Sequence, residues 1–459
     1  MSALANVKIL DFSTLLPGPF GTLVLADLGA QILRVEAPGR TDLARIIGEL
    51  DGDASYAHRY LNRSKKSIGL DLKKPDAIEI VKQLIAEYDV VVEQFRPGVM
   101  DKLGLGYQAL KAINPKLIYC SLTGYGQTGP YKDRGGHDNN YLAIAGTQDY
   151  SRRVNTAPVP AGIQIADVAG GSMHLVAGLL AAVIQRLETG IGQQIDISIT
   201  DAAFSLNVFA ASNYLGAETT TGPEQELLNG QQFYDYYQTN DERYFSVGGL
   251  EPQFKKSLCE AIGQPALVEL ALSPKLENQQ AFKAQLTDIF KSQNFAYWQK
   301  LFRSIDACVE PVLTMDEACQ HEQINSREMI VEVDGIKQVG CAIKMSASPA
   351  KYHFKGCNLG EHNQILQQEF GFSEQQINQV IVAGVGMTKF CKPGQQEPYR
   401  VMAATAINIA LADAGIDATK IQQAFGAYIY GDSTCAQHAF YDVIQSGIPV
   451  INVNNNCSS

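Results

Sequence analysis

Short β-branched, apolar runs that alternate with amphipathic helical stretches constrain the fold of this chain more than any other feature. Several of the runs are apolar throughout, as the buried strands of parallel sheets are. The predicted strands cover residues 7–12, 32–35, 67–72, 90–95, 117–122 and 194–198. Strands that alternate with helices are typical of an α/β fold with a doubly wound parallel sheet. We therefore predict a Rossmann-like large domain.

Two helices within this pattern carry clear start or stop signals. Lys74-Pro75-Asp76 opens the first, and the apolar residues that follow recur on one helical face. The second covers residues 167–188, begins at Asp167 and stops at Gly190.

The amino-acid composition changes at two further points along the chain. Residues 225–330 are aromatic and polar, with a hairpin predicted around Asn240-Asp241 and short helices after it. Residues 356–379 are rich in Gln and Asn and are interpreted as a tail and linker, after which a strand at 380–390 and a helix at 400–415 indicate a new domain. The predicted division is a large α/β domain at 1–200 and 325–375, a smaller α+β domain at 225–320, and a further segment at 380–459.

Composition excludes several functional classes. The 459 residues carry 37 Lys and Arg against 48 Asp and Glu, a net charge of −11, so nucleic acid is not an expected partner. Nine irregularly spaced cysteines without a CxxC pair indicate a reducing compartment and no metal site. No transmembrane segment or secretion signal is visible. Cytoplasm is the default location, with peroxisome and mitochondrion as alternatives.

Two groups of cationic side chains are candidates for binding an anion. Residues 59–74 carry Arg59, Arg63, Lys65, Lys66, Lys73 and Lys74 against one acid, Asp71. Such a cluster is either a solvated surface or a phosphate-binding patch. Arg96, in the stretch Gln94–Gly98, follows a predicted buried strand, and ligands of open α/β sheets bind at the carboxyl ends of strands.

Three further residues are candidate acids or bases, although none of them decides the function alone. His137 lies in a glycine-rich stretch after a strand, and Glu251 follows a predicted strand and two glycines. Asp167 stands at a helix start, where it is either a simple N-cap or a base whose charged form the helix dipole favours.

Several segments in the same order resemble the α-methylacyl-CoA racemases of the family III CoA-transferase (CaiB/BaiF-like) superfamily. They include EQFRPGVMDKLGLGY, TGYGQTGPYKDRGGHDNNYLAIAG, IADVAGGSMHLVAGLLAAVIQRLETG, SVGGLEPQF, SIDACVEPVLTMDEACQHEQINSREM and LGEHN. The resemblance extends from about residue 5 to residue 370.

The resemblance implies epimerisation of 2-methylacyl-CoA thioesters at C2 by 1,1-proton transfer through an enolate. His137 supported by Glu251 forms one base and Asp167 forms the other, because inversion needs an acid/base group on each face of a planar enolate. Coenzyme A is then part of the substrate, and no metal or other cofactor is implied. Two alternatives stay open: a family III CoA-transferase with Asp167 as nucleophile, and a non-catalytic protein that binds CoA or a thiolase partner.

The resemblance also implies a CoA site and an assembly. Ala37 stands where relatives often have an arginine close to the adenosine phosphates, which puts that contact in doubt. Members of the superfamily form interlocked dimers, so a homodimer is expected, in which Glu251 faces His137 and Asp167 of the other subunit. The expected CoA-binding positions are Arg63, Lys65, Arg96, Pro97, Gly98, Gly136 and Asp138.

A second resemblance covers residues 380–459. VIVAGVGMTKF, AINIALADAGIDATKIQQAFGAYIYGD and PVINVNNNCSS resemble the start of a sterol-carrier-protein-type thiolase. Cys457 falls at the position of that family's nucleophile, but the helix that would activate the thiol is not in the sequence. We expect a truncated thiolase-fold segment without thiolase activity.

Overall fold

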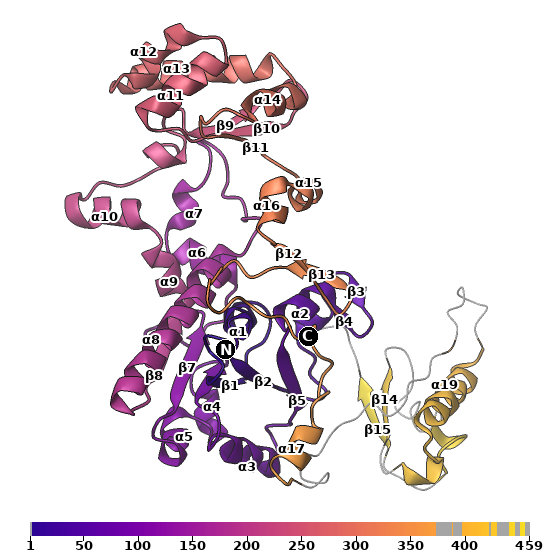
Figure 1. Cartoon of the computed structure of the whole chain (residues 1–459). Helices are drawn as coiled ribbons and strands as arrows, with labels where there is room; N and C mark the ends of the chain where they lie inside the picture. The colour runs from indigo at the N-terminus through magenta and orange to yellow at the C-terminus, as the bar shows by residue number, and fades with distance from the viewer. Residues whose placement is uncertain are drawn as a thin grey trace. The chain divides into compact units, whose positions relative to one another are not determined.

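The computed structural model describes residues 2–372, 388, 397–421, 424–428, 440–445 and 450–454. The chain divides into two compact units, Met1–Asn378 and Gln379–Ser459. Each unit is described by itself (Figure 1).

A six-stranded, fully parallel sheet organises the first unit. The spatial order is β5-β2-β1-β6-β7-β8. Counted along the chain within this sheet, that order is 3-2-1-4-5-6, the doubly wound Rossmann order. The predicted parallel sheet and its six strands are confirmed, at β1 (Lys8–Asp11), β2 (Gln31–Glu36), β5 (Lys65–Gly69), β6 (Val90–Glu93), β7 (Ile118–Thr123) and β8 (Gln194–Ser198).

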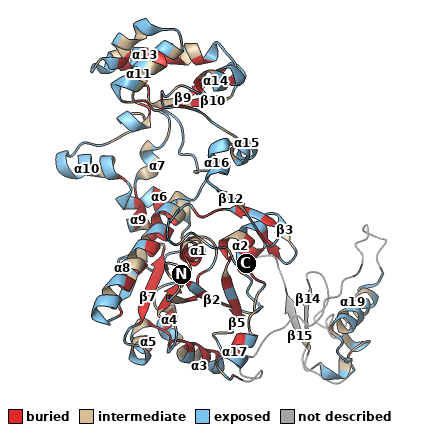
Figure 2. Ribbon diagram, viewed as in Figure 1, coloured by how far each residue is buried: buried red, intermediate tan, exposed pale blue. Residues whose placement is uncertain are grey.

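Helices cover both faces of the sheet and create two hydrophobic cores, seen as the buried ribbon of Figure 2. One core packs α1 (Pro17–Asp27), α6 (Asp138–Ile144), α8 (Met173–Thr189) and α9 (Ile199–Ser205) against the sheet. The other packs α3 (Pro75–Leu84), α4 (Val99–Lys102), α5 (Tyr107–Ile113) and α17 (Gln364–Gln368). The helix predicted to open at Lys74-Pro75-Asp76 is α3, which has Pro75 in its first turn.

The long helix predicted at 167–188 is present, but its first turns are not α-helical. Residues Ala166–Ser172 form a π-helix that continues directly into α8. Gly190 ends the helix with φ +72°, a left-handed conformation that suits a residue without Cβ. By length and composition Ala166–Thr189 could cross a membrane, yet Leu175, Leu179 and Val183 pack in the core of the sheet.

An aromatic core holds together a second group of elements in the first unit. Its antiparallel sheet consists of β9 (Asp235–Gln238), β10 (Tyr244–Val247) and β11 (Val309–Pro311), and β9 and β10 form the hairpin predicted around Asn240-Asp241. Phe290 stacks on Tyr237 and contacts Trp298. The main helices are α11 (Pro252–Ala261), α13 (Leu276–Lys291) and α14 (Phe295–Phe302).

Residues 356–372, predicted as a tail within the large domain and the start of a linker, pack against the parallel sheet. Leu366 is fully buried and Phe372 nearly so, both in the core that contains α3. The Gln-rich sequence covers the outside of a short amphipathic helix, α17, whose apolar residues close this face of the sheet.

The second unit contains the predicted helix as α19 (Tyr399–Ala414), which ends at Gly415 with φ +64°. A parallel pair joins β14 (Ala424–Tyr428) to β15 (Val450–Asn454). The strand predicted at 380–390, apart from residue 388, and Cys457 lie outside the described residues. The thiolase resemblance therefore stays a prediction.

Candidate active site

The strand order of the sheet reverses between β1 and β6, and the carboxyl ends of these two strands open a crevice. Gly18, at the start of α1, donates its backbone N–H to Gln94 Oε1 at 3.2 Å, across this reversal point. A Cβ on Gly18 would lie 2.3 Å from Ser13 Cβ, so no larger residue fits there. Ligands of doubly wound sheets bind at such a point.

Arg96 lies at this edge of the sheet, as predicted, and its side chain is exposed. It follows β6 in a turn that Pro97 and Gly98 complete, with Gly98 at φ +79° before α4. The Arg96 guanidinium lies against the glycine-rich loop, 3.2 Å from where a Cβ of Gly135 would be. Sequence reasoning missed a second exposed guanidinium in this loop, Arg134, which stacks 3.7 Å from the Tyr131 ring centroid.

The glycine-rich loop is shaped by one aromatic ring. A Cβ on Gly124 would lie 2.5 Å from Tyr141 Cε1, and a Cβ on Gly136 would lie 2.7 Å from the same atom. The Tyr141 hydroxyl donates a hydrogen bond to the carbonyl of Gly136. The ring therefore holds both ends of the loop and fixes where His137, the exposed N-cap of α6, begins the helix.

A hydrogen bond connects the start of α6 to the π-helix. Asp138, the first residue of α6, accepts the backbone N–H of Asp167 on its Oδ1 at 3.0 Å. Because His137 directly precedes Asp138, this bond brings together the segments of two predicted acid/base residues. Asp138 thus has a protein partner in addition to its predicted role in substrate binding.

The π-helix is fixed from two sides. Ser172 Oγ lies 2.6 Å from the carbonyl oxygen of Pro17 and 3.0 Å from that of Asp167. A Cβ on Gly171 would lie 3.0 Å from Ile199 Cγ1, so α9 packs tightly on this turn. π-helical turns are often found at functional sites.

The pKa of Asp167 is raised to about 7, chiefly by burial and further by the negative charge of Asp138. Both effects oppose the helix dipole, which favours the ionised carboxylate. A carboxyl group with this pKa exchanges protons at neutral pH.

Glu251 lies apart from these residues within one chain. It is the exposed N-cap of α11, in the elements around the aromatic core. No hydrogen bond or ion pair joins Glu251 to His137 or Asp167, all three of which belong to the described part of the chain.

The predicted phosphate patch is wrong for Arg63 and Lys65, which are buried. Arg63 forms two hydrogen bonds to Asp27, at 2.9 and 2.6 Å. Lys65 Nζ donates to Pro19 O and Thr22 Oγ1 at 2.7 and 2.8 Å, and burial lowers its pKa to about 7. The local sequence contains few acids, but the fold brings these partners from α1.

Comparison with known proteins identifies the family. The model of the CoA-transferase family III matches residues 4–363. The chain is 34% identical to the human alpha-methylacyl-CoA racemase, over 82% of this chain and 96% of the relative. It is 32% identical to the acetyl-CoA:oxalate CoA-transferase of Acetobacter aceti, over 80% of this chain and 96% of the relative. The chain belongs to the family III CoA-transferases.

Solved structures agree with this family. A CAIB/BAIF family protein from Brucella suis matches with a TM-score of 0.70 and 29% identity, over 80% of this chain and 99% of that one. The protein Rv3272 from Mycobacterium tuberculosis matches with a TM-score of 0.68 and 28% identity, over 79% and 99%. Racemases and CoA-transferases both occur in the family, and identities of 34% and 32% do not separate them.

Replacing Arg63 should lower the stability of this family III member and leave its affinity for CoA unchanged. Arg63→Ala leaves Asp27 buried without its partner, so we expect the free energy of unfolding in urea to fall by about 3–5 kcal/mol. Lys73→Ala, at an exposed lysine of the same sequence cluster, should change it by less than about 0.5 kcal/mol. If Arg63→Ala kept the stability of the wild type and bound CoA more weakly, Arg63 would belong to the phosphate site.

Replacing Asp138 should lower the pKa of Asp167. Asp138→Asn removes the negative charge that adds to the effect of burial, so the carboxyl of Asp167 will lose its proton at lower pH than in the wild type. The measurement is an NMR titration of ¹³C-labelled aspartate carboxyls, with Asp167→Asn assigning the signal. Asp133→Asn, exposed in the same loop, is the matched control. An Asp167 pKa that stays near 7 in Asp138→Asn would refute the coupling.

Proposed function

We propose that this chain epimerises 2-methylacyl-CoA thioesters at C2 by 1,1-proton transfer through an enolate. The observation that carries the proposal is the Asp138–Asp167 hydrogen bond, which joins a buried carboxyl with a pKa of about 7 to the helix start that presents His137.

The reaction requires two groups that both give and take a proton. One removes the C2 proton from one face, and the other delivers a proton to the opposite face of the enolate. Asp167 suits this role because its carboxyl is present in both protonation states near pH 7. His137 supplies the second group, since imidazole is the commonest acid/base side chain in catalysis and this one is exposed at the crevice loop.

The start of the π-helix can stabilise the enolate oxygen only if one of its donors is released. The N–H of Asp167 donates to Asp138, and the N–H of Val168 donates to the carbonyl of Gln164 at 2.9 Å. In our proposal the thioester oxygen takes the place of Asp138 Oδ1 on the Asp167 N–H. Donors aimed at a developing oxyanion lower the barrier of such steps substantially.

The CoA moiety is assigned to the reversal point of the sheet. Arg96, Pro97 and Gly98 follow β6 there, and Gly136 leads into His137. Arg134 adds a second exposed guanidinium to the same loop. A pair of exposed cations at this edge compensates locally for the net negative charge of the chain.

A CoA-transferase with Asp167 as nucleophile is the second candidate, because several relatives are named as such transferases. A nucleophilic carboxylate must be ionised, whereas a pKa of about 7 leaves Asp167 largely protonated below neutral pH. Both roles use the ionised carboxylate, and only proton transfer in both directions also uses the protonated form.

We also propose a homodimer in which Glu251 of one subunit supports His137 of the other. Helix α10 (Val208–Ala217) has no buried residue in the single chain. Its exposed apolar side chains are Val208, Phe209, Tyr214 and Leu215. A group of exposed apolar side chains on one element often marks a protein interface.

Deuterium exchange tests the reaction. In D₂O, the protein should incorporate deuterium at C2 of (2R)-2-methylacyl-CoA and form the 2S epimer, measured by mass spectrometry and chiral chromatography. His137→Ala and Asp167→Ala should each reduce epimerisation by about a hundredfold or more, because general acid/base groups contribute 10²–10⁴-fold. Asp133→Ala should leave the rate unchanged.

The alternative functions predict other outcomes of the same assay. Transfer of CoA to an added free acid without exchange at C2 would make the chain a transferase. Neither exchange nor transfer, with CoA still bound, would leave a binding protein.

Mixing two inactive variants tests the shared site. If Glu251 acts across the dimer, subunits of Glu251→Ala and His137→Ala that are unfolded together and refolded should regain activity. One of the two sites in a mixed dimer then contains both wild-type residues, so a mixture at equal amounts should recover about a quarter of wild-type activity. Full activity of a wild-type monomer would contradict the shared site.

A further inference from the structure

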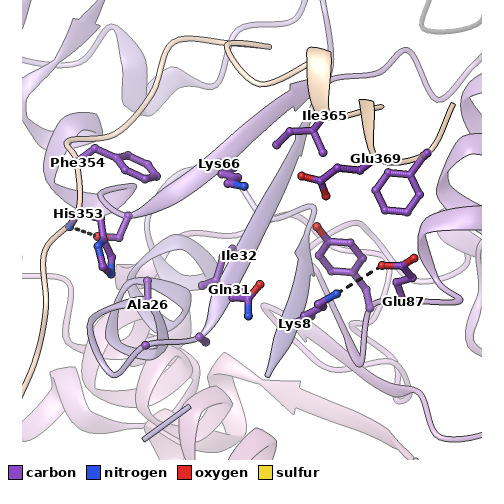
Figure 3. A pocket seen from close by; sticks show the side chains of 15 residues that line it. Lys8, Ala26, Gln31, Ile32, Lys66, Glu87, His353, Phe354, Ile365 and Glu369 are labelled. Atoms are coloured by element: carbon purple, nitrogen blue, oxygen red, sulfur yellow. Dashed lines mark hydrogen bonds and ion pairs between the residues drawn. The ribbon is translucent and has the colours of Figure 1, made fainter. Parts of the chain in front are cut away.

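A cavity of about 280 Å³ lies at the amino-terminal edge of the sheet. Lys8 and Gln31, which begin β1 and β2, and Lys66 of β5 line it. The candidate active site lies at the carboxyl edge of the same strands, so the cavity belongs to neither the acid/base residues nor the Arg96 loop. Figure 3 shows the cavity from close by.

Part of the cavity lining is apolar and aromatic. Ala26, Ala30, Ile32 and Ile365 are buried and supply an aliphatic surface. Phe354 and Phe370 add aromatic rings from the segment that returns to the sheet. This volume lies just below the range of about 300–1,000 Å³ typical of drug-sized ligands, and therefore suits a small molecule.

Four charged side chains line the cavity, and two of them already pair with each other. Lys8 Nζ lies 3.5 Å from Glu87 Oε2. Lys66 and Glu369 make no ion pair or side-chain hydrogen bond with any described residue. In Figure 3 both lie on the side of the cavity that carries Ile365, across from the Lys8–Glu87 pair. Among the described residues, the cavity thus offers one exposed cation and one exposed anion that do not pair with another side chain.

We infer that this cavity binds a free α-amino acid with an apolar side chain. Lys66 receives the carboxylate and Glu369 the ammonium group, each through a charge-assisted hydrogen bond. The surface formed by Ile32, Ile365 and the two phenylalanines takes the apolar side chain. A lining with balanced charge does not favour a polyphosphate, which separates this ligand from CoA in chemical class.

Binding of matched probes to the full-length chain tests the inference. Isothermal titration compares leucine with 4-methylpentanoate and 3-methylbutylamine, which keep the side chain and lack the ammonium group or the carboxylate, respectively. Leucine should bind, and each analogue should bind at least about tenfold more weakly, since a hydrogen bond to a charged group contributes about 1.5–3 kcal/mol.

Two charge-neutralising variants locate the site. Lys66→Gln should weaken the binding of leucine and 4-methylpentanoate and leave the binding of 3-methylbutylamine unchanged. Glu369→Gln should weaken the binding of leucine and 3-methylbutylamine and leave the binding of 4-methylpentanoate unchanged. Lys73→Gln and Glu260→Gln, at exposed residues outside the cavity, are the matched controls. C2 exchange activity, measured in parallel, should be unchanged in Glu369→Gln and Glu260→Gln.

Three outcomes would overturn the inference. The first is an absence of leucine binding at 10 mM, which corresponds to a binding free energy of about −2.7 kcal/mol. The second is leucine binding that both cavity variants leave unchanged. The third is binding of 4-methylpentanoate as tight as that of leucine. The last result would make the cavity a simple anion site. Because none of these readouts uses the proposed racemase reaction, failure of one proposal does not imply failure of the other.

Discussion

The reversal of strand order between β1 and β6 is the constraint on which the rest of the first unit depends. Chain segments leave these two neighbouring strands toward opposite faces of the sheet, so no connection covers their carboxyl ends. Gly18 stands where α1 begins, because a Cβ there would clash with the Ser13 side chain, and Gly98 follows β6 at φ +79°. The proposed acid/base residues His137 and Asp167 come from elsewhere in the chain, and they lie near this edge because α6 and the π-helix begin there.

Several charged side chains of the large α/β region are buried and pair with one another. Arg34 and Glu36 on β2 and Arg45 form a buried ionic cluster with Asp42. Breaking such a cluster leaves uncompensated charges, so it fixes the relative positions of the elements that contribute to it. Net charge computed from sequence therefore says little about the charge that a ligand meets. A ligand at one edge of the sheet meets the exposed charges of that edge, such as Arg96, and not the buried ones.

The sequence predicted the parallel sheet well, because runs that are apolar throughout mark strands buried on both faces. It predicted Arg96 at the ligand edge because strand polarity alone determines which end of the sheet that residue occupies. It failed for Arg63 and Lys65, whose partner residues are distant in sequence and become neighbours only after folding. The raised pKa of Asp167 could not be predicted for the same reason, since burial and the charge of Asp138 both arise from tertiary structure. Tyr141 lies within one of the segments that resemble the family, but its contacts with Gly124 and Gly136 become visible only in the folded chain.

The position of Asp167 around the helix axis depends on the π-helical turn. A π-helical turn accommodates one residue more than an α-helical turn does, and each residue of an α-helix turns the chain by about 100°. Deleting a single residue between Ala166 and Ser172 would allow a continuous α-helix and would rotate Asp167 to another side of the helix axis, with every side chain otherwise retained. The side of the helix on which Asp167, the proposed acid/base residue, lies is thus set by the number of residues in the turn as well as by their identity. Alignments of related chains that close a one-residue gap at this turn would pair the wrong residue with Asp167.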